Sequence, residues 1–298
     1  MLSLRPRSFW LRYYLFLLVQ KLGSVNKFGF PTLLVIFLVI GFLEIIGIDL
    51  YFAQIGILAA IFAYIAYQFL SPLFYTIKNG KLARIMDKYG YSEELLKAYE
   101  KARILNKPFD LTRSAQFAEI YVYIGQSEKA VEYLGSITLP KTPRRFEMVE
   151  YLRVYILALL KCGELEKAEE LWAENSYYIN RMKTIKDYSP NVGSVFLTEI
   201  YIECYAAFKG DESRLQRAYE LTTQYLDSQK ANGKSHLNGF DIILVYELRA
   251  LGKTEEADRF YPAALDKIDR YMSLFDFSRK IELQELEKAA NGVLPFLD

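Results

Sequence analysis

The chain has 298 residues, of which 52% are hydrophobic, and its 37 basic and 36 acidic side chains give a formal net charge of +1. So high a hydrophobic content with so little net charge excludes a disordered protein. Residues 76–298 carry 32 basic and 34 acidic side chains, which nearly cancel. The broad positive field that nucleic-acid binding requires is therefore missing, and we expect no nucleic-acid partner.

The first 27 residues form a basic and aromatic segment. They contain five basic side chains and no acidic one. The apolar run Phe9–Leu18 within them is too short to cross a bilayer, and Arg12 interrupts it. Such a segment is typical of a chain that lies along the cytoplasmic interface of a membrane.

Residues 28–75 form the most apolar part of the chain, with no basic residue and only two acidic ones. One bilayer crossing needs about 20 apolar residues, so the stretch predicts two transmembrane helices, near Phe28–Ile46 and Phe52–Tyr75, with a turn at Gly47–Leu50. A hairpin buried in a soluble core is the alternative interpretation of an apolar run of this length.

Basic residues flank the predicted membrane hairpin on both sides. Five precede the first span, and Lys78, Lys81, Arg84 and Lys88 follow the second. Because basic residues accumulate on the cytoplasmic side of a membrane, we expect both termini and everything after residue 75 to be cytoplasmic. This arrangement is compatible with an integral protein of a bacterial plasma membrane, bound to lipid through its two spans.

Small residues within the predicted spans form a possible helix-packing face, since small side chains let membrane helices approach closely. The second span contributes four of them at helical spacing. The residues are Gly41, Gly56, Ala59, Ala60 and Ala63. The face has two interpretations: packing of the two spans against each other, or contact with a partner's membrane helix.

Nearly the same six residues recur at Gly125–Ala130, Gly163–Ala168 and Gly252–Ala257. Each copy places a glycine where one helix must stop and an alanine where a small side chain lets the next helix pack closely. Looser copies at Gly90 and Gly210 give successive spacings of 35, 38, 47 and 42 residues. This period predicts one all-α domain over residues 76–298, an α-solenoid built from about five helical hairpins.

The last predicted helix covers about residues 273–290. It alternates apolar and charged residues, with Ile281, Leu283 and Leu286 among lysines and glutamates. This pattern is typical of the polar helix that caps the end of a repeat array.

The hairpins resemble those of the tetratricopeptide repeat (TPR) family. The copy at residues 111–143 carries the family's pattern of small, aromatic and glycine positions in Ala118, Tyr121, Gly125, Ala130 and Leu134. The resemblance implies a concave groove, lined by the first helix of each hairpin, that binds a peptide or protein. By register, the groove-facing residues would be Glu119, Tyr123, Arg153, Leu157, Lys161, Tyr246 and Arg249.

Residues that would carry chemistry are few and dispersed. No metalloprotease, nucleophile-elbow or phosphate-loop motif is present. The two cysteines, Cys162 and Cys204, have neither disulfide nor metal-ligand spacing, and His236 is the only histidine. We therefore predict that the protein is not an enzyme and holds no metal or cofactor.

The sequence supports two hypotheses about function. In the first, the chain is a membrane-anchored TPR-like adaptor or scaffold that binds a protein or peptide at the cytoplasmic face. Because the first repeat follows the second span almost without a linker, that partner is expected to be membrane-associated. In the second, the chain is a subunit or assembly factor of a membrane complex and contacts its partners through the transmembrane hairpin.

Overall fold

The computed structural model describes residues 70, 73, 76, 77, 79–101, 110–184, 190–231, 237–270 and 276–297. These residues form helices and turns, with no strand among them. The contacts divide the chain into two compact units, Met1–Lys88 and Tyr89–Asp298. The predicted all-α fold is confirmed for the described residues, and the account below concerns the second unit.

The second unit contains eleven labelled helices among its described residues. In chain order they are α3 (Glu93–Lys101), α4 (Leu111–Tyr123), α5 (Ser127–Gly135), α6 (Arg145–Lys161), α7 (Leu165–Glu174), α8 (Ser176–Lys183), α9 (Pro190–Phe208), α10 (Ser213–Ala231), α11 (Asn238–Ala250), α12 (Thr254–Arg270) and α13 (Asp276–Ala290).

A glycine ends the first helix of each hairpin, as the repeated phrase predicts. All five predicted glycines have positive φ, from 66° at Gly90 to 115° at Gly210, a conformation that costs glycine little and other residues more. At Gly125 the amide of Gln126 donates to the Tyr121 carbonyl at 2.8 Å, and the Gly125 amide donates to the Val122 carbonyl. This pair of bonds is the Schellman motif, which satisfies the last carbonyls of the helix.

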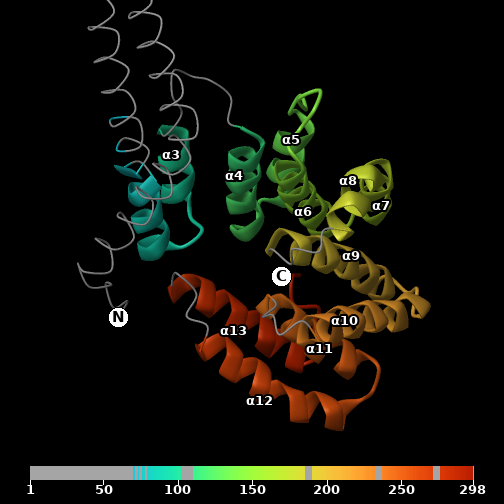
Figure 1. Ribbon diagram of the computed structural model, residues 1–298. Helices are drawn as coiled ribbons and strands as arrows, with labels where there is room; N and C mark the ends of the chain where they lie inside the picture. Colours follow the sequence, from blue (N-terminus) through green and yellow to red (C-terminus); the bar gives the residue numbers. More distant parts are fainter. Residues whose placement is uncertain are drawn as a thin grey trace, which may run out of the picture. The chain divides into compact units, whose positions relative to one another are not determined.

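The helices form two layers (Figure 1). α4, α6, α9, α11 and α13 pack side by side in that order, and α5, α7, α10 and α12 each pack against the first helix of their own hairpin. This arrangement is consistent with an α-solenoid. The alanines Ala130, Ala168 and Ala257 of the repeated phrase are fully buried at these hairpin contacts.

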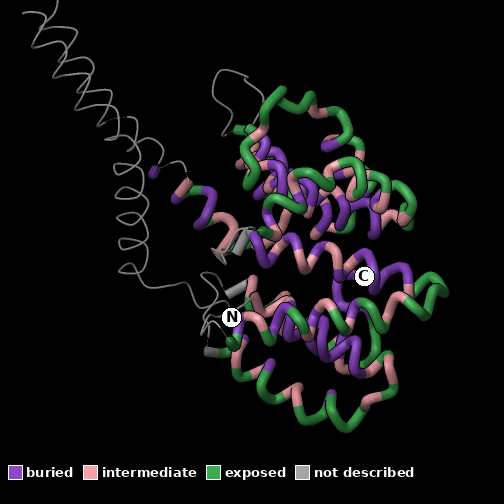
Figure 2. The backbone as a smooth tube through the Cα atoms, turned by 45° about the vertical axis from the view of Figure 1, so that its right-hand side comes forward, coloured by how far each residue is buried: buried purple, intermediate pink, exposed green. Residues whose placement is uncertain are grey.

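The two layers differ in how they are buried (Figure 2). In α11, nine consecutive residues, from Phe240 to Leu248, are all buried. In α7, by contrast, only Ala168 is buried. A helix enclosed by neighbours on several sides is apolar all round, and one that lies on the outside has a single apolar stripe. The inner layer therefore contains most of the hydrophobic core.

Two features of the array differ from the sequence interpretation. Helix α8 is inserted between α7 and α9 and packs on α6, α7 and α9, which explains the long spacing between Gly163 and Gly210. Gly292, which the repeat count did not include, has φ 72° and ends α13 with the same pair of backbone bonds. Helix α13 is thus built like the first helix of another hairpin.

The predicted membrane hairpin at residues 28–75 lies almost entirely outside the described residues, as does its small-residue face of Gly41, Gly56, Ala59, Ala60 and Ala63. Within the described part of the chain, no helix has both the length and the apolar character needed to cross a bilayer. The two predicted spans stay a prediction.

Candidate partner-binding groove

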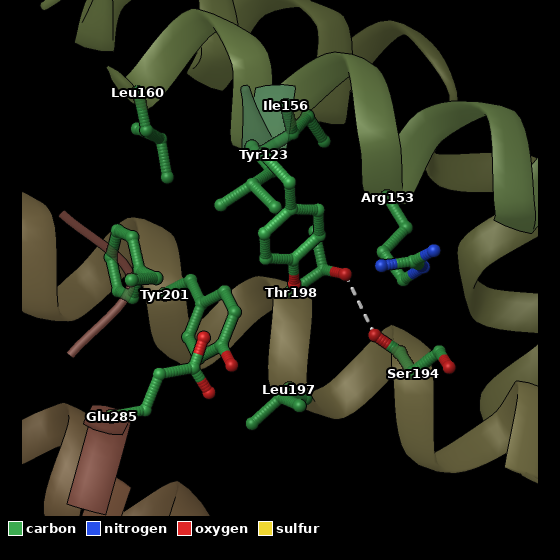
Figure 3. A pocket seen from close by; sticks show the side chains of 11 residues that line it. Tyr123, Arg153, Ile156, Leu160, Ser194, Leu197, Thr198, Tyr201 and Glu285 are labelled. Atoms are coloured by element: carbon green, nitrogen blue, oxygen red, sulfur yellow. Dashed lines mark hydrogen bonds between the residues drawn. The ribbon is translucent and has the colours of Figure 1, made fainter. Parts of the chain in front are cut away.

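Four inner helices and the segment after α13 enclose a cavity of about 70 Å³ (Figure 3). Tyr123 reaches it from the end of α4, and Glu285 reaches it from α13 on the opposite side. The full lining is Tyr123, Arg153, Ile156, Leu157, Leu160, Ser194, Leu197, Thr198, Tyr201, Glu285 and Phe296. An aliphatic wall from α6 therefore faces a wall from α9 that carries hydroxyl groups.

Arg153 connects two neighbouring inner helices at one edge of this cavity. Its Nη2 atom lies 2.6 Å from Oε1 of Glu119 on α4 and 2.8 Å from Oε1 of Glu150 on its own helix. Burial opposes the positive charge of the guanidinium, but the two carboxylates outweigh it and raise the pKa of Arg153 well above its usual value. Arg153 therefore keeps its positive charge between the two carboxyl groups.

Aromatic rings stack on both sides of the cavity. Tyr123 stacks on Tyr91 with ring centroids 4.4 Å apart, and Tyr201 stacks on Phe296 at 4.3 Å. Burial, together with the nearby Glu285 carboxyl, raises the pKa of the Tyr123 and Tyr201 hydroxyls. Both phenols are therefore neutral at physiological pH and present their hydroxyl groups as hydrogen-bonding groups.

Glu285 is the one acidic residue that lines this cavity. Burial and the neighbouring Glu282 raise its pKa to about 7, although Lys161 and Lys288 act in the opposite direction. Its usual value is near 4.5, so its charge changes within the physiological pH range. A basic group brought into the cavity would favour the ionised form.

A second, more open cavity of about 400 Å³ adjoins the first at Leu160. It lies beside two hairpin turns and the end of α9. Its lining is Gly125, Ser127, Glu128, Leu160, Lys161, Cys162, Gly163, Tyr205, Lys209 and Leu297. We call the two cavities together the groove.

The structure brings together five of the seven residues that register placed in the groove. Tyr123, Arg153 and Leu157 line the smaller cavity, Lys161 lines the larger one, and Glu119 pairs with Arg153. All five residues lie on α4 and α6.

Tyr246 and Arg249 lie elsewhere, because the corresponding face of α11 packs on other helices. Tyr246 is 5% exposed, and burial raises its pKa to about 12. Arg249 forms an ion pair with Asp258 on α12. Neither residue lines the two cavities.

The sequence interpretation did not include the part of the groove contributed by α9, α13 and the segment that follows. The repeat that contains Gly210 is the least regular one, and no groove residues were predicted in it from the sequence. Its first helix contributes Ser194, Thr198 and Tyr201. Glu285 and Phe296 lie on either side of Gly292. A signal was available for the three residues of α9, because counting back from Gly210 leads to that helix, but the residues around Gly292 do not repeat the phrase.

The core next to the groove contains a second unusual acidic residue, Glu247 of α11. Its Oε1 atom accepts a hydrogen bond of 2.9 Å from Thr222 Oγ1 and a longer contact from Cys204 Sγ. Its Oε2 atom is buried without a partner. Burial raises the pKa of Glu247 to about 8, so the carboxyl is mostly neutral at pH 7.

Clustered metal ligands and reactive thiols would be further candidate sites. No cluster of three or more histidine, cysteine, aspartate or glutamate side chains with metal-holding geometry occurs among the described residues. Both cysteines are free, and burial raises the pKa of each thiol. The groove is therefore the arrangement within the described part of the chain that best fits a ligand.

Comparison with known proteins gives no match to a family model, to a curated protein or to a solved structure.

Proposed function

We propose that the protein is a membrane-anchored TPR-like adaptor whose groove binds a segment of another protein at the cytoplasmic face of a bacterial plasma membrane. The observation that carries the proposal is the groove itself, formed by successive inner helices whose hairpins all turn at a glycine of positive φ. Repeat arrays of this kind generally function by presenting such a surface to a partner.

The lining of the groove fits a peptide better than a small polar metabolite. Stacked aromatic rings and aliphatic side chains of α6 provide apolar contact area. Arg153, Glu285 and Lys161 add charged groups at separate points. Tyrosine and arginine are enriched among the residues that dominate binding energy at protein interfaces.

The predicted membrane anchor indicates what kind of partner the groove would meet. Residues 28–75 have the composition of two spans, and an anchored groove would meet membrane-bound proteins at a high effective concentration. We therefore expect the partner to be membrane-associated, and we propose no catalytic, cofactor or nucleic-acid role for the chain.

A charge reversal within the groove tests the proposal. We expect Lys161→Glu to reduce recovery of the partner at least about fivefold when the protein is crosslinked in cells and purified in mild detergent. The matched control is Lys167→Glu on α7, because Lys167 is well exposed and lies outside both cavities. Equal recovery with both variants, or no crosslinked partner with the unmodified chain, would count against the groove.

The second candidate function, a subunit or assembly factor acting through its membrane hairpin, is favoured by the small-residue face of the second span. Replacement of residues 28–75 by an unrelated two-span anchor separates the two. Function retained after the exchange supports the adaptor, and function lost with the repeat domain still folded supports the subunit.

A further inference from the structure

The chain leaves the hairpin pattern after Gly292. At the earlier turns a second helix starts two or three residues after the glycine, as at Ser127 and Ser213. After Gly292 the chain makes the same turn, with the Val293 amide donating to the Lys288 carbonyl at 3.0 Å, but no helix follows in the described residues. We call the segment 293–297 the tail, and two of its residues, Phe296 and Leu297, line the groove.

The tail contacts both cavities through neighbouring side chains. Phe296 stacks on Tyr201 and lines the smaller cavity, while Leu297 lines the larger one. Leu294 and Phe296 are only 2% and 5% exposed. Lys288 Nζ donates to the Leu297 carbonyl at 2.6 Å. The groove therefore already holds a short turn of the chain, through an aromatic ring and aliphatic side chains, with the Leu297 carbonyl bound by Lys288 of α13.

The tail fills the groove incompletely. About 70 Å³ stays open beside Phe296, and about 400 Å³ stays open beside Leu297. The larger cavity is open to solvent, so a longer segment has room beside Leu297. The Leu297 amide donates to the Leu294 carbonyl within the tail itself, so this bond does not attach the tail to the inner helices. Leu294 and Phe296 pack in the hydrophobic core, so side-chain contacts hold the tail, and its displacement would break those contacts and the bond from Lys288 but would unfold no helix.

We propose that the tail is an intramolecular ligand of the groove, and that the partner displaces it with a segment of the same chemistry, an aromatic residue flanked by aliphatic ones. This inference rests on the proposed function and specifies its ligand and its regulation. The partner can bind only while the tail is out of the groove. Its apparent affinity is therefore the intrinsic affinity multiplied by the fraction of time that the groove is free of the tail. Binding by a partner and release of the tail are then the same event.

A peptide exchange experiment tests this. The probe is a fluorescein-labelled peptide with the sequence Asn291–Asp298, added to the full chain in mild detergent. We expect Phe296→Ala, which removes the ring stacked on Tyr201, to bind the probe at least about tenfold more tightly than the unmodified chain. Val293→Ala is the matched control, because Val293 is 49% exposed and its loss should leave the tail in place. A probe peptide in which alanine replaces the phenylalanine should bind neither the unmodified chain nor the Phe296→Ala chain.

Failure of the probe to bind a Phe296→Ala chain that keeps its helical circular dichroism would overturn the proposal. The unmodified chain supplies a second readout that does not depend on the folding of any variant. We expect the backbone amides of the four non-proline residues among 293–297 to exchange with deuterium at least about tenfold faster than those of α9. Exchange of the tail only at the rate of global unfolding would make it a fixed part of the core and would also overturn the proposal.

The two proposals fail in different ways. If the probe binds the Phe296→Ala chain but no cellular partner is crosslinked, the tail is a ligand and the adaptor function is wrong. If a partner is recovered equally well with the unmodified chain and with Phe296→Ala, the adaptor function stands and the competition by the tail is wrong.

Discussion

The contact between α4 and α6 and the contact between α10 and α11 bury acidic side chains in opposite ways. At the first, Glu119 and Glu150 both pair with Arg153, and the three side chains keep between 15% and 24% of their surface exposed. At the second, Glu247 is fully buried and accepts hydrogen bonds from Thr222 and Cys204, with no cation paired with it among the described residues. The array thus keeps fixed charges at the groove and a neutral acid in its core.

This difference separates binding from stacking. A charge at the edge of a cavity is available to a partner and sets its orientation. A buried carboxyl without a cation is best tolerated when it is protonated, since desolvation penalises the charged form. Under the proposed function, the Arg153 region would contribute to recognition, whereas the Glu247 region would have a structural role.

The largest expected effect is the pH dependence caused by Glu247. Its pKa is about 8 in the folded protein and near 4.5 in a free side chain. Between these values the folded state binds more protons than the unfolded state, so the free energy of unfolding falls as the pH rises from 4.5 to 8. The loss should be on the order of 4 kcal/mol, as measured by denaturant unfolding at pH 5 and pH 9.

The variant Glu247→Gln isolates this contribution, because it keeps the shape of the side chain and removes its titration. We expect it to be more stable than the unmodified chain at pH 9 and to have a flatter stability profile. Glu285→Gln should flatten the profile less and only up to about pH 7, since the pKa of Glu285 is raised to about 7. An unchanged profile in Glu247→Gln would show that this carboxyl is ionised in the folded state.

A smaller effect is expected at the ionised cluster. Arg153→Met keeps the aliphatic part of the side chain but leaves Glu119 and Glu150 without their cation. Because these groups are partly exposed, we expect a loss of about 2 kcal/mol in the free energy of unfolding, below the value for a fully buried pair. Arg144→Met is the control, since the Arg144 side chain is 84% exposed in its pair with Glu147 and should cost less than about 0.5 kcal/mol.

The smallest effect concerns the turns that both regions share. Gly163 has φ 84°, and an added Cβ would meet only the Tyr205 hydroxyl at 3.8 Å. Gly163→Ala should therefore cost about 1 kcal/mol from backbone strain alone, measured by thermal unfolding. Glu132→Ala, at an exposed position of α5, should leave the midpoint nearly unchanged. A neutral Gly163→Ala would contradict the role given to the hairpin glycines.

The parts of the fold that depend on local backbone chemistry were predictable from the sequence. A turn at positive φ favours glycine, and a close helix contact favours alanine. Both preferences are visible in the sequence, which is why it predicts the five turns and the hairpins around them. Helix α8 and the turn at Gly292 were missed because their residues do not repeat the phrase. The groove was predictable where the register is regular, at Tyr123, Arg153 and Leu157, and not where long-range packing decides the environment, at Tyr246 and Arg249.

The most direct test of the groove is site-specific photocrosslinking in cells. A photoreactive amino acid replaces Lys161, which lines the larger cavity, or Lys167, which lies on α7 outside it. We predict that position 161 yields a discrete crosslinked product with a membrane-associated protein, that position 167 does not, and that Phe296→Ala increases the yield at 161. Crosslinking that is equal at the two positions, or confined to 167, would contradict the proposal that the groove binds the partner.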